Sequence, residues 1–413
     1  MDMKIWFLKL FSAFLRNEHI EEKETPWTEE EGEKLLQLAT YHNVVAIIYE
    51  AAMKQALFSS FSPELLGTWR KLAMVSVAKR ANRTHEFLQL YDKMKKEGLT
   101  PVVVKGMICR AMYPKPDYRP SGDEDLLIEK DDFWKMDAFL IQEGFSRKES
   151  EEELKKHMST LHEVGYRNRQ TGLYLEIHVS LFPEKAGAYG HYNTLFENAC
   201  KNTTIIQAEG CDIATLCPTD HFLYLLCHSA KHFMHSGFGV RQLVDLLLFA
   251  EQYGNEIDWA EVMEKAKKVH VDTFLIHLLT LGVQYFAFDI EKSQWPQETQ
   301  RIHEDVECED LLEDLLHGGV FGASTMERLH SANITLAAAE HQGKGARVLA
   351  SLFPSRSYME KQYGYVKAHP WLLPVGWLHR FGTYIWKGNT NSRKTVKTGE
   401  RRVKLLKKYK LIS

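Results

Sequence analysis

Apolar residues at helical spacing dominate the N-terminal part of the chain. In residues 1–23 they place Trp6, Leu10 and Phe14 on one face of a predicted amphipathic helix. We expect this face to pack on the body of the protein; docking to a membrane interface is the alternative. Basic residues interrupt the apolar pattern, so it predicts neither a secretory signal nor a membrane span. No run of about 18 apolar residues follows elsewhere.

Residues 27–95 continue the helical pattern. Thr28 and Glu31 have the spacing of a capping box, which predicts a helix that begins after Thr28. Thr84 is expected to begin a further helix, and Gly98 is expected to end it.

The pattern then changes to short apolar runs with turn residues between them. Residues 101–106 are β-branched and end in glycine, which is typical of a buried strand. A Thr-Gly pair at 171–172 lies between two runs of strand type and predicts a hairpin. The predicted elements are strands at 101–106, 123–130, 162–168 and 173–182, with helices at 107–113 and 131–145.

Strand patterns end at Pro183, and helical patterns dominate from Pro218 to about residue 350. We therefore predict an α+β fold, with a small mixed-sheet core flanked by N-terminal and C-terminal helical regions. The predicted segments are an N-terminal helical region at 1–95, the α/β core at 96–185, a helical domain at 186–350 that forms the second wall of a cleft, and a C-terminal extension at 351–413 with a basic tail.

Composition narrows the class of protein. The 413 residues carry a net charge of −3, which does not favour nucleic acid as the main partner. Six cysteines without a CxxC pair favour reduced thiols and a cytoplasmic location. From Arg393 onward the chain contains nine Lys or Arg residues and a single acidic residue, Glu400. We expect a solvated end there, with contact to RNA or anionic lipid as the alternative.

Acidic residues begin the strand predicted at 123–130 and recur on a later strand. Because side chains alternate between strand faces, Asp123 and Asp125 should share one face while Glu124 points to the other. Two carboxylates this close repel each other unless a cation lies between them, and Mg²⁺ prefers such oxygen ligands. Glu176 would complete a three-carboxylate site across the sheet. A solvated strand end is the alternative interpretation of the aspartates.

Residues near these acids suit phosphate binding. Gly106 follows a buried strand, where a missing side chain lets a phosphate approach backbone N–H groups at a helix start. Lys105 and Arg119 would supply positive charge to phosphate oxygens.

This arrangement resembles the DNA polymerase beta-like nucleotidyltransferase superfamily, and more narrowly a bacterial uncharacterised nucleotidyltransferase family. The resemblance covers residues 101–180 well and 30–385 loosely. It rests on Val104-Lys105-Gly106, Met112-Tyr113, Arg119, Gly122-Asp123-Glu124-Asp125-Leu126-Leu127, Glu176-Ile177-His178 and the segment 228–245.

Two positions depart from the superfamily pattern. Lys-Gly stands where Gly-Ser is usual, so no serine hydroxyl is available for phosphate at that position. Glu124 replaces a residue that is usually apolar, which is tolerable on a solvated strand face and unfavourable on a buried one.

The resemblance implies an enzyme that moves a nucleoside monophosphate from an NTP, such as ATP, to an acceptor hydroxyl. Asp123, Asp125 and Glu176 would hold Mg²⁺, with two ions about 3.5–4 Å apart in the full reaction. The acceptor could be a small molecule, a peptide, a protein or RNA, and the sequence does not choose among them. Nucleic acid is expected as a partner only in the role of acceptor. The alternatives are a non-catalytic nucleotide sensor or partner-binding protein on the same scaffold, and a toxin-like enzyme that modifies tRNA or protein.

Further polar residues could line the cleft. Lys231 is expected to contact the triphosphate, a surface lysine being the alternative; His228, Lys231, His232 and His235 share one helical face. His228 and His232 have the spacing of a zinc pair but lack an HExxH pattern, which favours structural histidines.

Two more sets complete the predicted site. Arg241 and Asp245 either pair at i, i+4 or face the cleft. His178 shares the strand face of Glu176 and would orient a ligand or assist proton transfer; a hydrogen-bonded wall residue is the alternative.

Overall fold

The computed structural model describes residues 3–20, 26–55, 57–235, 237–297, 307–319, 326–340, 353, 356–386 and 392–412. Its contacts divide the chain into two compact units. The first unit comprises Met1–Cys227, Arg241–Val269 and Leu278–Val306, and the second comprises His228–Val240, His270–His277 and Glu307–Ser413. The four segments predicted from sequence stay a prediction.

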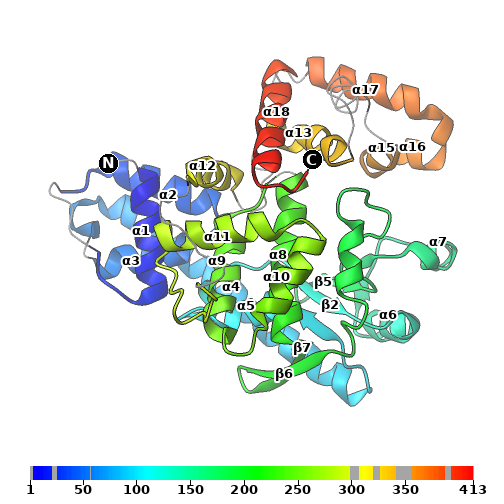
Figure 1. Cartoon of the computed structure of the whole chain (residues 1–413), viewed down its shortest axis with the longest axis horizontal. Helices are drawn as coiled ribbons and strands as arrows, with labels where there is room; N and C mark the ends of the chain where they lie inside the picture. The colour runs from blue at the N-terminus through cyan, green and yellow to red at the C-terminus, as the bar shows by residue number, and fades with distance from the viewer. Residues whose placement is uncertain are drawn as a thin grey trace. The chain divides into compact units, whose positions relative to one another are not determined.

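Helices α1 to α7 and α10 belong to the first unit (Figure 1). Helix α9 belongs to it as well, except for its first residue, Val240. Helices α8 and α11 contribute residues to both units. The bounds are α1 Met3–Arg16, α2 Glu29–Tyr41, α3 Val45–Lys54, α4 Pro63–Lys96, α5 Gly106–Ala111, α6 Phe133–Gln142, α7 Glu151–His157, α8 Pro218–His235, α9 Val240–Tyr253, α10 Trp259–Lys268 and α11 Asp272–Tyr285.

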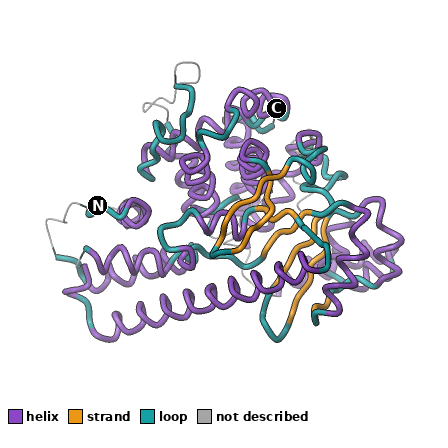
Figure 2. The backbone as a smooth tube through the Cα atoms, turned by 90° about the horizontal axis from the view of Figure 1, so that it is seen from below, coloured by secondary structure: helices purple, strands orange, loops and turns teal. Residues whose placement is uncertain are grey.

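Five strands of the first unit form a mixed sheet in the order β1-β2-β5-β4-β3, with helices around it (Figure 2). Strand β2 runs parallel to β5, and the other neighbours are antiparallel. The α+β prediction is therefore confirmed. The strands are β1 Val102–Val104, β2 Glu124–Leu127, β3 Phe145–Ser146, β4 Glu163–Asn168 and β5 Tyr174–His178.

Apolar strand residues account for the centre of this sheet. Val103 and Val104 of β1, Leu126 of β2 and Ile177 of β5 are all fully buried. The runs that predicted buried strands thus form the core, as the hydrophobic effect requires. The hairpin predicted around Thr171-Gly172 is confirmed, because β4 and β5 pair antiparallel and Gly172 adopts a positive φ of 74°.

Two predictions about this unit were wrong. Strands do not end at Pro183, because β6 Thr203–Ala208 and β7 Cys211–Leu216 form a second sheet. Thr84 does not begin a helix, because α4 runs continuously from Pro63 to Lys96. The Thr84 hydroxyl donates to the carbonyl of Arg80, one turn earlier, which lets threonine sit inside a helix.

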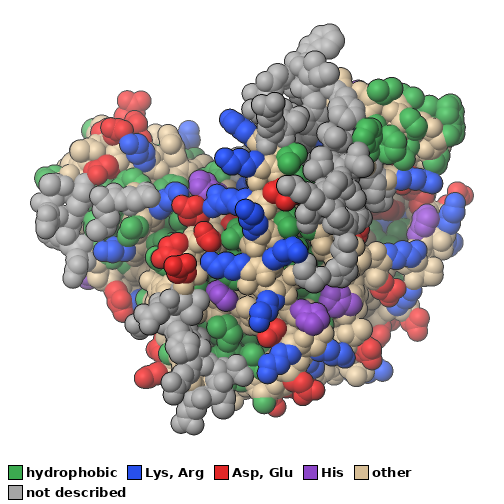
Figure 3. Space-filling view, turned by 45° about the horizontal axis from the view of Figure 1, so that its top comes forward, with side chains coloured by type: hydrophobic (Ala, Val, Ile, Leu, Met, Phe, Trp, Pro, Cys, Tyr) green, Lys and Arg blue, Asp and Glu red, His purple; other side chains and the backbone are tan. Residues whose placement is uncertain are grey.

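The N-terminal helix packs as predicted. Trp6, Leu10 and Phe14 are buried, and Arg16 at its last turn pairs with Glu251 of α9. Within the described residues no helix is long and apolar enough to cross a membrane. The described surface carries Lys or Arg beside Asp or Glu on the face drawn in Figure 3, in keeping with the small net charge.

The second unit is built from helices. In it α18 lies along α13 (Figure 1). Arg402 of α18 is 1% exposed and donates to the carbonyls of Phe233 and His235. The described part of the tail is thus a packed helix rather than a loose end, while its described Lys and Arg side chains other than Arg402 are exposed, as expected of a solvated basic segment. The bounds are α12 Glu309–Gly318, α13 Met326–Ala339, α15 Arg356–Gln362, α16 Gly364–Ala368, α17 Leu373–Trp386 and α18 Ser392–Lys408.

Candidate active site

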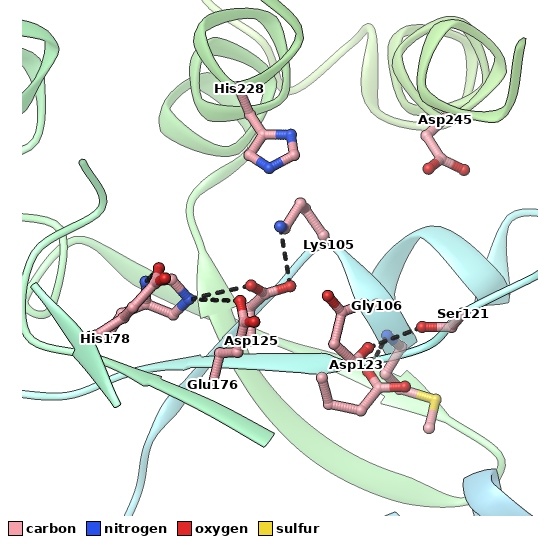
Figure 4. A network of polar contacts seen from close by, with 12 residues as sticks. Lys105, Gly106, Ser121, Asp123, Asp125, Glu176, His178, His228 and Asp245 are labelled. Atoms are coloured by element: carbon pink, nitrogen blue, oxygen red, sulfur yellow. Dashed lines mark hydrogen bonds and ion pairs between the residues drawn. The ribbon is translucent and has the colours of Figure 1, made fainter. Parts of the chain in front are cut away.

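Strand register brings two of the predicted carboxylates together. Asp125 of β2 pairs with Glu176 of the parallel strand β5, so both side chains lie on one sheet face (Figure 4). His178, two residues further along β5, shares that face. One donor atom from each of Asp125, Glu176 and His178 lies within 4.8 Å of the others.

Asp125 is the most strongly held member of this set. It is 2% exposed, and its carboxylate lies 3.0 Å from Lys105 Nζ and 3.0 Å from His178 Nε2. Burial by itself would raise the pKa of Asp125, but Lys105 and His178 outweigh it and hold the pKa well below its usual range. Because a carboxylate only accepts, His178 donates through Nε2–H.

Glu176 is an acid whose negative charge its surroundings disfavour. Burial, followed by the charges of Asp125, Glu163 and Asp123, raises the pKa of Glu176 from 4.5 to about 7. The folded protein therefore binds a proton at Glu176 more tightly than the unfolded chain does. The resulting contribution to stability is fully present below about pH 4.5 and is lost as the pH rises through about 7. A cation beside Glu176 would remove the cost of ionising it.

Asp123 lies at the entrance to β2. It precedes the first strand residue, is half-buried, and falls outside the compact set formed by Asp125, Glu176 and His178. Its charge still contributes to raising the pKa of Glu176. Ser121 fixes the local backbone by donating from its hydroxyl to the Asp123 carbonyl at 2.8 Å.

Glu124 points to the opposite, buried side of β2, where the structure provides partners for it. Its carboxylate accepts from the Met107 N–H at 2.8 Å and lies 3.0 Å from an Arg110 nitrogen. A Cβ on Gly106 would lie 2.0 Å from Glu124 Oε2, so only glycine leaves room for this carboxylate. Gly106 was predicted to bind phosphate, and neither the role of Arg110 nor this packing reason was predicted from the sequence.

Lys105 adopts a strained backbone conformation between β1 and α5. Its φ of 56° and ψ of −113° cost about 1–3 kcal/mol for a residue with a side chain. The Lys105 N–H donates to His221 Nε2 at 3.2 Å. Thr215 Oγ1 donates to the Val103 carbonyl at 2.7 Å and so accepts from His221 Nδ1–H at 3.1 Å.

These contacts require His221 to stay neutral. Burial lowers the pKa of His221 to about 3, so its Nε2 lone pair is available to the Lys105 N–H at neutral pH. His221 therefore holds the backbone whose side chain reaches Asp125. No local motif in the sequence marks this histidine.

Arginines bind the loop that leads to Asp123. Its carbonyl oxygens at 118, 120 and 121 each accept from one guanidinium. Arg80 donates to Tyr118 at 2.9 Å, Arg83 to Ser121 at 3.1 Å and Arg241 to Pro120 at 2.7 Å. Arg80 and Arg83 escaped the sequence analysis because their partners are backbone atoms distant in sequence.

Arg119 and Asp245 form a buried ion pair. Arg119 Nε and one terminal nitrogen each lie 2.8 Å from an Asp245 oxygen, and the other terminal nitrogen donates to the Gly106 carbonyl at 3.1 Å. Tyr113 also donates to Asp245, at 3.0 Å. These contacts give Arg119 and Asp245 a structural role. Their expected roles at the nucleotide and in the cleft stay predictions.

The comparison with protein families decides the class. The profile described as uncharacterised nucleotidyltransferase matches residues 28–287, which is more than half of the chain. The chain belongs to this nucleotidyltransferase family. The comparisons with curated proteins and with solved structures returned no match.

Four more of the predicted residues lie on the part of α8 that belongs to the second unit. His228 Nε2 and His232 Nε2 lie 3.1 Å apart there, and Lys231 and His235 belong to the same helix. Their role as a second wall of the nucleotide site stays a prediction.

Proposed function

We propose that this protein transfers a nucleoside monophosphate from an NTP, with ATP as one candidate donor, to an acceptor hydroxyl in a Mg²⁺-dependent reaction. The register that sets Asp125 beside Glu176 carries this proposal, in a chain that belongs to a nucleotidyltransferase family. The acceptor oxygen bonds to the α-phosphorus, the bond to pyrophosphate breaks, and the acceptor proton passes to water.

The donor set suits a hard cation. Asp123, Asp125 and Glu176 would hold Mg²⁺, which prefers carboxylate oxygens and keeps its other positions for water and phosphate. Bound there, the cation offsets the charge of the triphosphate and of the entering and leaving oxygens. The raised pKa of Glu176 supports this assignment, because burial and the neighbouring carboxylates disfavour its charge and a bound cation would favour it.

Other residues of the chain would position this set. His178 donates to Asp125 and fixes the orientation of its carboxylate. Lys105 neutralises the same carboxylate and would supply positive charge to a phosphate oxygen beside it. Lys231 remains a proposed ligand of the triphosphate. The acceptor class stays open between small molecules, peptides, proteins and RNA.

A melting experiment tests metal and nucleotide binding together. Adding Mg²⁺ and a non-hydrolysable NTP should raise Tm, because a ligand at a hundred times its Kd stabilises the folded state by about 2.7 kcal/mol. The shift should be larger at about pH 8 than at about pH 6, because protons compete for Glu176, whose pKa is about 7.

Glu176→Gln should reduce the shift and flatten its pH dependence. Glu152→Gln, at an exposed position on α7, is the matched control and should behave as the unmodified protein. An unchanged Tm with Mg²⁺ and NTP together would count directly against the proposed function.

A further inference from the structure

A second group of potential metal ligands lies beside the candidate active site. His162 precedes β4, Glu163 is the first residue of β4, and His178 is the last residue of β5. The antiparallel register pairs Glu163 with His178. One donor atom from each of the three residues lies within 4.8 Å of the others.

His178 presents its second ring nitrogen, Nδ1, to this group. In the neutral ring whose Nε2–H donates to Asp125, the lone pair is on Nδ1. Nδ1 has no hydrogen-bond partner among the described residues, in a side chain only 4% exposed, and it lies 3.6 Å from Glu163 Oε2. A lone pair that faces a carboxylate favours a cation between the two atoms.

The second histidine is oriented in the same way. Ser180 donates its hydroxyl to the Phe182 carbonyl at 3.1 Å, so its oxygen accepts from His162 Nδ1–H at 3.2 Å. The lone pair of His162 is therefore on Nε2, which lies 3.1 Å from Glu163 Oε2. Two imidazole nitrogens and one carboxylate oxygen thus lie within 4.8 Å of one another.

We propose that His162, Glu163 and His178 bind a zinc-type transition-metal ion. Two histidines and one glutamate are a known donor set for zinc that leaves a fourth position open. Ligands about 2.0–2.1 Å from a tetrahedral ion are about 3.4 Å apart, and the Glu163 oxygen lies 3.1 Å and 3.6 Å from the two histidine nitrogens. The Glu163 side chain is 41% exposed, which gives the ion a path from solvent.

The outer contacts match those of metal-bound histidines. Such histidines donate their other ring N–H to a carboxylate or another acceptor, which fixes the tautomer. His178 does so to Asp125, and His162 does so to Ser180. An ion at His178 Nδ1 would therefore keep Nε2–H directed at Asp125. The proposal stands independently of nucleotide transfer, although the two sites share His178.

Cobalt(II) is a suitable probe, because it replaces zinc and absorbs visible light when tetrahedral. The full chain, stripped with a chelator, should bind one equivalent of Co²⁺ with such a spectrum, and Zn²⁺ should displace it. Glu163→Gln should weaken Co²⁺ binding by at least about tenfold, and His162→Asn should do the same. Glu163→His, which restores a ligand, should retain binding.

Controls separate this site from the carboxylate set. His157→Asn, at an exposed histidine of α7, should leave Co²⁺ binding unchanged, and so should Glu176→Gln. Excess Mg²⁺ should not displace Co²⁺, because Mg²⁺ prefers oxygen ligands. Absence of Co²⁺ binding would overturn the proposal. So would full binding by Glu163→Gln, or binding that Glu176→Gln abolishes and Glu163→Gln retains.

Discussion

Asp123→Asn should lower kcat for nucleotide transfer by about a thousandfold or more while the fold stays intact. The asparagine keeps the shape of the side chain but removes a charge that would bind the metal. Loss of about 4 kcal/mol of transition-state stabilisation corresponds to that factor. The substitution is structurally mild, because Asp123 is half-buried and precedes β2.

Pyrophosphate release from NTP, measured with a panel of acceptors, reports this activity. Asp131→Asn, at an exposed aspartate just beyond β2, is the matched control and should retain full turnover. Full turnover in Asp123→Asn would contradict the proposed mechanism. Tight Mg²⁺-dependent NTP binding without turnover in the unmodified protein would favour the nucleotide-sensor alternative.

Arg119→Met should destabilise the protein by about 3–5 kcal/mol, because it leaves the Asp245 carboxylate buried without its cation. The two side chains are only 3% and 6% exposed, so solvent cannot replace the lost partner. Urea unfolding monitored by circular dichroism measures the change. The Gly106 carbonyl also loses a donor, which adds to the destabilisation.

Two variants sharpen this test. Lys93→Met breaks a surface pair with Glu143, whose side chains are 56% and 24% exposed, and should cost no more than about 1 kcal/mol. Arg119→Met combined with Asp245→Leu should recover part of the lost stability. If Arg119→Met folds normally and only raises KM for NTP, Arg119 is a phosphate ligand, as the sequence analysis expected.

Local patterns were enough to predict the elements around the site. The β-branched run at 102–104 and the Thr-Gly turn at 171–172 act over a few residues, so β1 and the β4–β5 hairpin follow from neighbours in sequence. The pairing of Asp125 with Glu176 was also predictable in outline. Both acids lie on strands of one small sheet, and strand alternation assigns them a face.

Long-range partners were not predictable from one sequence. Arg119 and Asp245 are 126 positions apart, and no local pattern assigns them to each other. Thr84 has the features of a helix start but lies inside α4, where its bond to the Arg80 carbonyl suits a helix interior. Gly106 was assigned to phosphate binding because it follows a buried strand. Its contact with Glu124 was not predictable, because that contact depends on the packing of β2 against α5.

A crystal structure of the full chain with Mg²⁺ and a non-hydrolysable NTP tests the central claim most directly. We expect an ion about 2.0–2.1 Å from carboxylate oxygens of Asp123 and Asp125, with Glu176 beside it and the triphosphate against the ion. A nucleotide bound away from these residues, or an ion without contact to either aspartate, would contradict the proposed nucleotidyl transfer.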